Sequence, residues 1–203
     1  MATVEFFFDC SSPWTYLGFH RMVQLSAELD QPVTWRPFLV GGVFNTVNPS
    51  VYRSRETPVP AKQAYMLKDL ADWARHYGLA IRWPQKIFPV NSVKAMRACF
   101  FADAQGRLVP FARAAFEAYW GEMRDISQDD VVADVAAKAG LDPAAILAAA
   151  AGDDAKARLR ANTDELIARG GFGSPTVFVD GTDMYFGNDR LDLVAAALRR
   201  APA

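Results

Sequence analysis

The chain is poor in cysteine. Its 203 residues include only Cys10 and Cys99, and no Cys-x-x-Cys motif occurs. Two distant cysteines provide no disulfide framework, so a disulfide-stabilised fold is excluded. Dithiol–disulfide exchange needs two thiols at one site, so this activity is excluded as well. We expect Cys10 to pack along a strand and Cys99 to lie in a helical core, because a buried free cysteine behaves as a small hydrophobe.

Histidine is equally scarce, which argues against two common classes of enzyme. The two histidines, His20 and His76, and the two cysteines have no paired spacing typical of zinc, so we predict no metal site. A serine hydrolase needs a base beside its nucleophile, yet His20 lies roughly 12 Å beyond Ser12 along a predicted helix. The sequence also contains no Gly-x-Ser-x-Gly, no Gly-x-Gly-x-x-Gly and no P-loop.

An excess of charge and a long apolar segment are also missing. A formal net charge of −1 and a pI near 6.1 give no electrostatic footprint for nucleic acid. No apolar run is long enough to cross a bilayer, and the short run that contains Glu5 and ends at Asp9 follows no Lys or Arg, unlike a secretory signal. We therefore expect a cytoplasmic protein that binds neither nucleic acid nor membrane.

Apolar residues, by contrast, are abundant, at 51% of the chain with 12% aromatic, and they show clear periodicity. They predict a buried strand at residues 2–8, an amphipathic helix from about 13 to 29 and a second strand at 33–40. Pro37 in the second strand indicates an edge position. Strand, helix and strand in so short a span form a βαβ unit, whose two strands are parallel.

The C-terminal part returns to β structure. Residues 176–179 and 184–186 flank Asp180-Gly181, a dipeptide that favours a hairpin turn. Asp189 is then expected to cap a last helix. With the first unit, this order gives βαβ…ββα, so we predict an α/β, thioredoxin-like fold with a large all-helical insertion.

The middle of the chain has a different character. Residues 41–59 contain glycines and prolines without periodicity and predict a long loop. A helix is predicted at 60–77, a second loop at 83–91, and further helices up to residue 170. The predicted organisation is a discontinuous thioredoxin-like domain, residues 1–43 plus 171–203, and an inserted helical domain, residues 44–170.

Three short stretches could carry chemistry. Ser12-Pro13 follows the first strand, where a strand that breaks into a helix leaves free N–H groups beside a hydroxyl, a natural anion site. Ser174-Pro175 precedes the third strand, and a cis bond there would leave the backbone N–H and C=O of Ser174 free for a ligand. Asn188-Asp189 could hold an ammonium group beside a helix start. Each stretch alone is equally compatible with a helix cap or a loop.

Together these stretches resemble a family. Ser12-Pro13 after a Phe-rich strand, residues 172–176 (Phe-Gly-Ser-Pro-Thr) and residues 187–191 (Gly-Asn-Asp-Arg-Leu) look like those of 2-hydroxychromene-2-carboxylate isomerases. They are also similar to kappa-class glutathione transferases. Residues 60–70 and 88–91 add further matches, so the resemblance covers about residues 3 to 198.

The resemblance implies glutathione as cofactor and assigns roles residue by residue. Ser12 would be the catalytic residue, because its hydroxyl would hydrogen-bond the sulfur of glutathione and favour the thiolate. The other residues would bind glutathione or substrate: Ser174 beside a cis Pro175 the cysteinyl part, Asn188 and Asp189 the γ-glutamyl end, Lys62 and Asn48 the glycyl carboxylate or the substrate. Trp14 would contribute to an aromatic substrate pocket.

The implied reaction is the interconversion of 2-hydroxychromene-2-carboxylate, or a related intermediate of aromatic catabolism, with a trans-configured 2-oxo acid by reversible thiolate addition. Three alternatives for the chain's function stay open. It could be such an isomerase, a kappa-like transferase or peroxidase acting on other electrophiles, or a non-catalytic thioredoxin-fold binding protein. A homodimer is implied by the resemblance alone.

Overall fold

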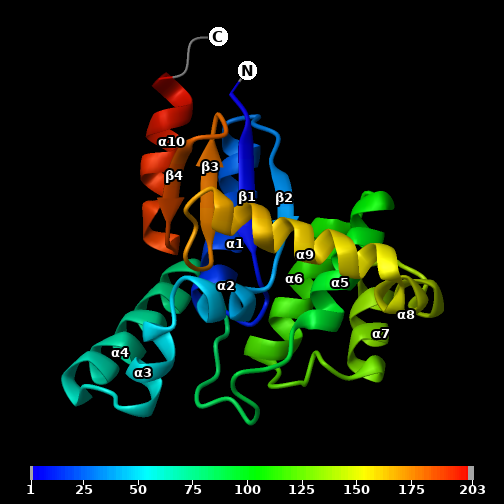
Figure 1. Cartoon of the computed structure of the whole chain (residues 1–203), viewed down its shortest axis with the longest axis horizontal. Helices are drawn as coiled ribbons and strands as arrows, with labels where there is room; N and C mark the ends of the chain where they lie inside the picture. The colour runs from blue at the N-terminus through cyan, green and yellow to red at the C-terminus, as the bar shows by residue number, and fades with distance from the viewer. Residues whose placement is uncertain (1, 201–203) are drawn as a thin grey trace.

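The computed structural model describes residues 2–200, which are built around a four-stranded mixed sheet in the order β2-β1-β3-β4 (Figure 1). β1 (Val4–Phe8) pairs in parallel with β2 (Thr34–Pro37) and antiparallel with β3 (Thr176–Val179), which forms a hairpin with β4 (Asp183–Phe186). The predicted thioredoxin-like order of strands is confirmed.

β1 lies at the centre because its side chains are apolar on both faces of the sheet. Phe6 and Phe8 pack on one face against Phe19, and Phe7 packs on the other face against Phe178. All five rings are buried. β2 is one of the two edge strands, as its proline predicted, and Pro37 is its last residue.

Helices cover both faces of the sheet. α1 (Pro13–Glu28) and α10 (Leu191–Arg200) pack on the face of Phe6 and Phe8, while α9 (Asp153–Ala168) runs across the opposite face (Figure 1). α9 thereby connects the sheet to the helical block.

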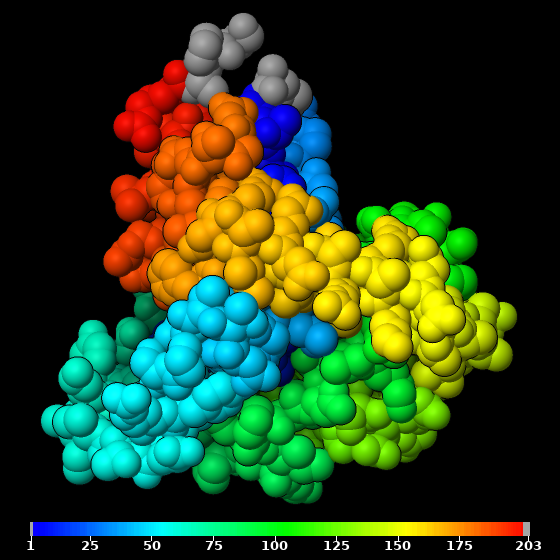
Figure 2. Space-filling model, viewed as in Figure 1, coloured from blue at the N-terminus to red at the C-terminus, as the bar shows by residue number. Residues whose placement is uncertain are grey.

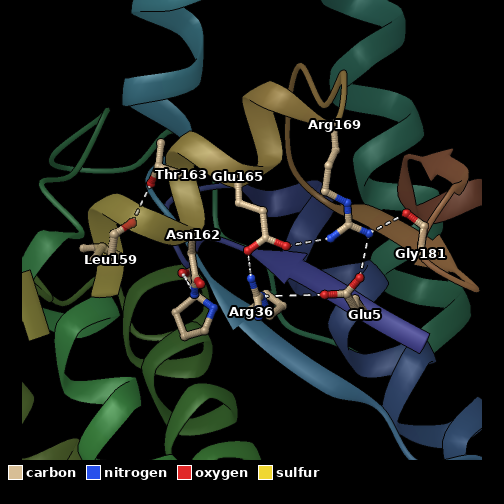
Figure 3. Close-up of polar contacts among 9 residues, drawn as sticks. Glu5, Arg36, Leu159, Asn162, Thr163, Glu165, Arg169 and Gly181 are labelled. Atoms are coloured by element: carbon tan, nitrogen blue, oxygen red, sulfur yellow. Dashed lines mark hydrogen bonds and ion pairs between the residues drawn. The ribbon is translucent and has the colours of Figure 1, made fainter. Parts of the chain in front are cut away.

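The end of α9 is fixed to the sheet by a charged network (Figure 3). Arg169 donates to Glu5 Oε2 at 2.6 Å, to Glu165 Oε1 at 2.9 Å and to the carbonyl of Gly181 at 2.9 Å. Arg36 from β2 pairs with the same two glutamates. Only about a fifth of the Arg169 and Glu5 side chains is exposed, so this network lies largely out of water.

The helical block consists of α5 (Val93–Ala104), α6 (Leu108–Phe116), a π-helical turn (Glu117–Gly121), α7 (Asp129–Lys138) and α8 (Pro143–Ala151). Its apolar side chains join those of β1 and α1 in one hydrophobic core that includes Cys10 and Cys99. Trp120 donates its indole N–H to the carbonyl of Cys10 at 2.9 Å. Both cysteines are fully buried, as expected, and the division into two domains stays a prediction.

The loop predicted at residues 41–59 is wrong. This segment forms α2 (Val40–Thr46) and α3 (Ser50–Glu56), which lead into the predicted helix α4 (Pro60–Tyr77). α2 forms despite its two glycines because Val40 and Val43 pack into the apolar cluster on the α9 face of the sheet. No helix within residues 2–200 has the length and apolarity required to span a bilayer.

Candidate functional site

Ser12 stands at the N-terminus of α1, as the sequence predicted. It is the N-cap residue, and its Oγ accepts a hydrogen bond from the N–H of Thr15 at 3.2 Å. Pro13 occupies the first helical turn, where its fixed φ is favourable. The positive end of the helix dipole therefore acts at the Ser12 hydroxyl, which favours a negative charge beside it.

The Ser12 hydroxyl faces the loop before β3. Its Oγ lies 3.4 Å from the carbonyl oxygen of Ser174, and the Ser174–Pro175 peptide bond is cis, which confirms the prediction. Among residues 2–200 nothing accepts a hydrogen bond from the Ser174 N–H. A buried backbone donor without an acceptor beside a cleft is a position at which a ligand carbonyl can bind.

The Ser174 side chain is held by residues on both sides of Ser12. Thr15 donates its hydroxyl to Ser174 Oγ at 2.7 Å, and the backbone N–H of Asp9 donates to the same oxygen at 3.2 Å. Thr15 is fully buried and Ser174 nearly so. These bonds fix the distance between the start of α1 and the loop before β3, so the two walls of the site are mutually positioned.

Asp9 is a buried acidic residue three positions before Ser12. Its Oδ1 accepts from the N–H of Ser11 and its Oδ2 from the N–H of Val40, each at 2.9 Å. Burial raises the pKa of Asp9 above its ordinary value, although these hydrogen bonds oppose the shift. Asp9 thus ties the loop that carries Ser12 to the start of α2.

Ser12 opens into a cleft of about 1410 Å³. Its walls come from the start of α1, from α2, α3 and α4, from the 83–91 segment and from the loop before β3. The aromatic side chains in these walls are Trp14, Phe44, Tyr52, Trp83, Phe88, Phe172 and Phe186. The cleft is therefore lined with aromatic side chains, as the predicted substrate pocket requires, and Trp14 lies in its wall.

The structure brings most of the predicted site residues to this cleft. Ser12, Trp14, Asn48, Lys62 and Ser174 all line it. The amide of Asn48 is already engaged, because it donates to the carbonyl of Phe172 at 3.1 Å and accepts from the Ser50 hydroxyl at 2.7 Å. Lys62 is exposed.

Asn188 and Asp189 line a different, smaller cavity of about 430 Å³ between α1, α4 and the start of α10. A Cβ on Gly18 would lie 2.9 Å from Cγ of Pro175 and 3.6 Å from Cα of Asn188, so Pro175 and Asn188 both pack closely against Gly18. The Asn188 side-chain nitrogen is buried, and no acceptor for it occurs in the described part of the chain.

The expected role of Asp189 as a helix cap is wrong. Residues 188–190 form a 3-10 turn that runs directly into α10, so no break exists for Asp189 to cap. Its carboxylate instead accepts from Arg190 Nη1 at 2.5 Å. Asp189 is exposed and remains available to a ligand from the small cavity.

Comparison with known proteins agrees with this architecture. Residues 3–199 match the family described as DSBA-like thioredoxin domain. The chain belongs to the DSBA-like thioredoxin domain family. This family member has Ser12 and Thr15 at the start of α1, where dithiol exchange would require thiols.

Named relatives of this DSBA-like chain are similar to it over nearly their whole length. A 2-hydroxychromene-2-carboxylate isomerase of Pseudomonas putida is 29% identical over 200 residues, 97% of this chain and 94% of that protein. Human glutathione S-transferase kappa 1 is 28% identical over 210 residues, 97% and 90% of the two chains. A solved 2-hydroxychromene-2-carboxylate isomerase structure superimposes with a TM-score of 0.82 at 27% identity, over 98% of this chain and 95% of the other. The resemblance noted in the sequence is thereby confirmed.

Several residues that line the cleft or hold its walls together were not foreseen from the sequence. Asp9 and Thr15 were missed because their partners, Val40 and Ser174, are distant in sequence. Arg53 and Arg55 also line the cleft, and they were missed because their segment was predicted to be a loop. A signal was available, since a run with two arginines and Tyr52 between prolines is compatible with a short amphipathic helix.

Proposed function

We propose that the protein is a glutathione-dependent isomerase acting on an aromatic 2-oxo acid of the 2-hydroxychromene-2-carboxylate type. The observation that supports this most directly is the placement of the Ser12 hydroxyl at the N-terminus of α1, facing the Ser174 backbone across an aromatic cleft. A hydroxyl there can stabilise a ligand thiolate without forming a disulfide with it.

The residues present fit glutathione in three respects. The Ser174 N–H lacks an acceptor and matches a peptide carbonyl of the cysteinyl part. The exposed ammonium of Lys62 matches the glycyl carboxylate, with Asn48 beside it in the cleft wall. The buried amide nitrogen of Asn188 matches an oxygen of the γ-glutamyl end, which would reach Asn188 and Asp189 past Pro175.

The chemistry divides between cofactor and protein. When bound, glutathione supplies a thiolate that adds reversibly to the conjugated double bond of the substrate. The Ser12 O–H turns from the Ser174 carbonyl, a long bond at 3.4 Å, to donate to the sulfur. This donor and the helix N-terminus lower the pKa of the thiol, and the aromatic walls exclude water and orient the ring of the substrate.

The alternative enzyme is a kappa-like glutathione transferase or peroxidase acting on other electrophiles, which the similarity to kappa-class relatives favours. It would use the same thiolate site, so binding of glutathione does not discriminate between the two. The two enzymes are distinguished by comparing the rate of turnover of 2-hydroxychromene-2-carboxylate with that of 1-chloro-2,4-dinitrobenzene. Substantial turnover of the aryl halide alone would reject the isomerase in favour of the transferase.

Calorimetry with glutathione is the primary test of the cofactor. We expect binding at millimolar concentration or tighter, weakened about tenfold by Asp189→Ala through loss of one charged contact. Asp164→Ala is the matched control, because Asp164 is an exposed aspartate on α9, away from both cavities. Ser12→Ala should retain binding but lower kcat by roughly two orders of magnitude.

Two results would contradict the proposal. Absence of glutathione binding to the wild-type protein would remove the cofactor. Rates that are the same for the wild type and Ser12→Ala, both at the level without protein, would remove the catalytic role of the hydroxyl and favour the non-catalytic thioredoxin-fold binding protein, in which this position is only a helix cap. The homodimer implied by the resemblance is a separate proposal, which sedimentation equilibrium tests directly.

A further inference from the structure

The cleft carries an excess of positive charge that the protein leaves unneutralised. Arg53 and Arg55 from α3 and Lys62 from α4 line it, and all three are exposed. None of the ion pairs formed among residues 2–200 involves any of these cations. The only carboxylate in the lining belongs to Asp9.

Asp9 does not serve as the counter-ion for these cations. Both of its oxygens accept backbone hydrogen bonds, from Ser11 and from Val40, and its side chain is buried. The Asp9 carboxyl group is therefore engaged with the chain after β1 and with the start of α2, whereas the three cations stand in the wall formed by α3 and α4. The positive charge of that wall is left for a ligand to neutralise.

One of the three cations is held in a defined place. The guanidinium carbon of Arg55 lies 5.3 Å from the ring centroid of Phe88 and 5.7 Å from that of Phe44. The rings come from the 83–91 segment and from α2, so Arg55 joins α3 to the opposite wall. In the space-filling view the cyan segment with α3 and the green segment after α4 adjoin below the sheet (Figure 2).

Contact with aromatic rings orders a guanidinium without consuming its hydrogen-bond donors. The rings attract the cation through their π faces, and the N–H groups in the guanidinium plane remain able to donate. A planar fork of N–H donors matches the two oxygens of a carboxylate, which a lysine ammonium does not. Arg55 thus combines an ordered position, free donors and an uncompensated charge inside an aromatic cleft.

We infer that Arg55 is a specificity-determining residue that binds a carboxylate on the electrophile, so that the cleft favours anionic aromatic substrates over neutral ones of the same shape. This inference rests on the proposed function, in which Lys62 and Asn48 serve glutathione and leave Arg55 for the second ligand. A purely structural role, in which Arg55 only pins α3 to Phe88, predicts the same loss for charged and neutral substrates.

The test compares two electrophiles with the same reacting double bond, the o-hydroxybenzylidenepyruvate anion and its methyl ester. Glutathione-dependent isomerisation of each to its chromene form is measured with the wild-type protein and with Arg55→Gln. We expect kcat/KM for the anion to fall about tenfold or more, as for loss of a charged hydrogen bond, and kcat/KM for the ester to change less than about twofold. An equal loss for both substrates, or no loss for the anion, would overturn the inference.

Arg53→Gln is the matched control, because it removes the same charge from the same helix and Arg53 contacts no ring in the described structure. Loss of a screened, solvated charge should lower kcat/KM for the anion no more than about twofold. An effect equal to that of Arg55→Gln would show that only the net charge matters and would reject Arg55 as the specific contact.

A binding measurement without glutathione separates this inference from the proposed function. Calorimetry with trans-cinnamate should show weaker binding to Arg55→Gln, with cinnamyl alcohol unaffected. If that holds while glutathione promotes no turnover of either electrophile, the carboxylate site stands and the glutathione-dependent function fails. If turnover occurs but cinnamate binds both proteins equally, the function stands and the role of Arg55 is rejected.

Discussion

Two sets of arginine–aromatic contacts in this molecule differ in whether the arginine also pairs with a carboxylate. On the α9 face of the sheet, Arg169 lies 3.8 Å from the centroid of Phe178, and Arg36 lies 5.3 Å from that of Phe7. Both of these arginines also pair with Glu5 and Glu165. In the cleft, the aromatic contacts of Arg55 are similar, but no carboxylate accompanies them.

The difference separates cations that stabilise the fold from a cation that can serve a ligand. A largely buried charge needs a partner, because an unpaired one carries a desolvation cost. The arginines of the sheet have their counter-ions within the chain and bring β1, β2 and α9 together. The cleft arginine is solvated, so it needs no internal partner and keeps its donors free.

The largest expected effect is a loss of stability when an arginine on the α9 face of the sheet is replaced. Arg169→Met leaves Glu5 and Glu165 short of a cation in a largely buried place, and it removes the bond to the Gly181 carbonyl. We expect a loss of about 3 kcal/mol in the free energy of unfolding. Urea unfolding followed by circular dichroism measures this loss.

The same substitution in the cleft is the control. Arg55→Met should cost less than about 1 kcal/mol, since only exposed cation–π contacts are lost. Similar losses for the two variants would show that the cleft arginine is as structural as the sheet arginine, and the contrast between the two regions would then be wrong.

A smaller effect is expected where the two walls of the site meet. Thr15→Val keeps the shape of a fully buried side chain but removes its 2.7 Å bond to Ser174 Oγ. We expect stability to fall by about 1 to 2 kcal/mol, and glutathione affinity to fall with it because the Ser174 backbone is no longer fixed. Thermal unfolding and calorimetry on the same variant test both. Unchanged affinity would show that Ser174 is positioned by other contacts.

The smallest effect concerns pH. The pKa of Asp9 is raised by burial, so the folded chain retains this proton at a pH where the unfolded chain has released it. By linkage, the stability of the wild type relative to Asp9→Asn is greatest below the unfolded pKa, about 3.9, and decreases as pH rises toward the folded pKa. Urea unfolding of both proteins from about pH 3.5 to about pH 7 measures the difference in their free energies of unfolding. A difference that increases with pH would contradict the raised pKa.

The sequence was sufficient to predict the fold because its pattern is local. Apolar runs of strand length at both ends, a helix between the first two and a hairpin dipeptide between the last two specify the βαβ…ββα order. The same reasoning failed for α3, which begins after Pro49 at its N-cap and has no buried residue, and for α2, where Gly41 and Gly42 oppose a helix locally. Burial of Val40 and Val43 against the sheet overrides those residues, and packing of that kind is not visible in a local pattern.

Prediction of the site was uneven for a similar reason. The position of Ser12 at the start of α1 was predicted from a short motif, whereas the cis bond before Pro175 was implied by the family resemblance, and both are present. The bond between Thr15 and Ser174 spans 159 residues and the bond between Asp9 and Val40 spans 31, so no local pattern predicts them. The expected cap at Asp189 failed because the turn before α10 continues into the helix without interruption.

The order of strands in the sheet also governs when the site can exist during synthesis. β1, near the start of the chain, has β3 from near its end as one of its two neighbours. A ribosome-bound chain has Ser12 from the outset but lacks the facing wall until residue 174 has left the exit tunnel. One edge of the central strand β1 therefore stays unpaired for nearly the whole of translation. Its pairing with β3 is non-local, and contacts of that kind delay folding. Fragments that end before β3 therefore lack the wall that faces Ser12, however well their helices form.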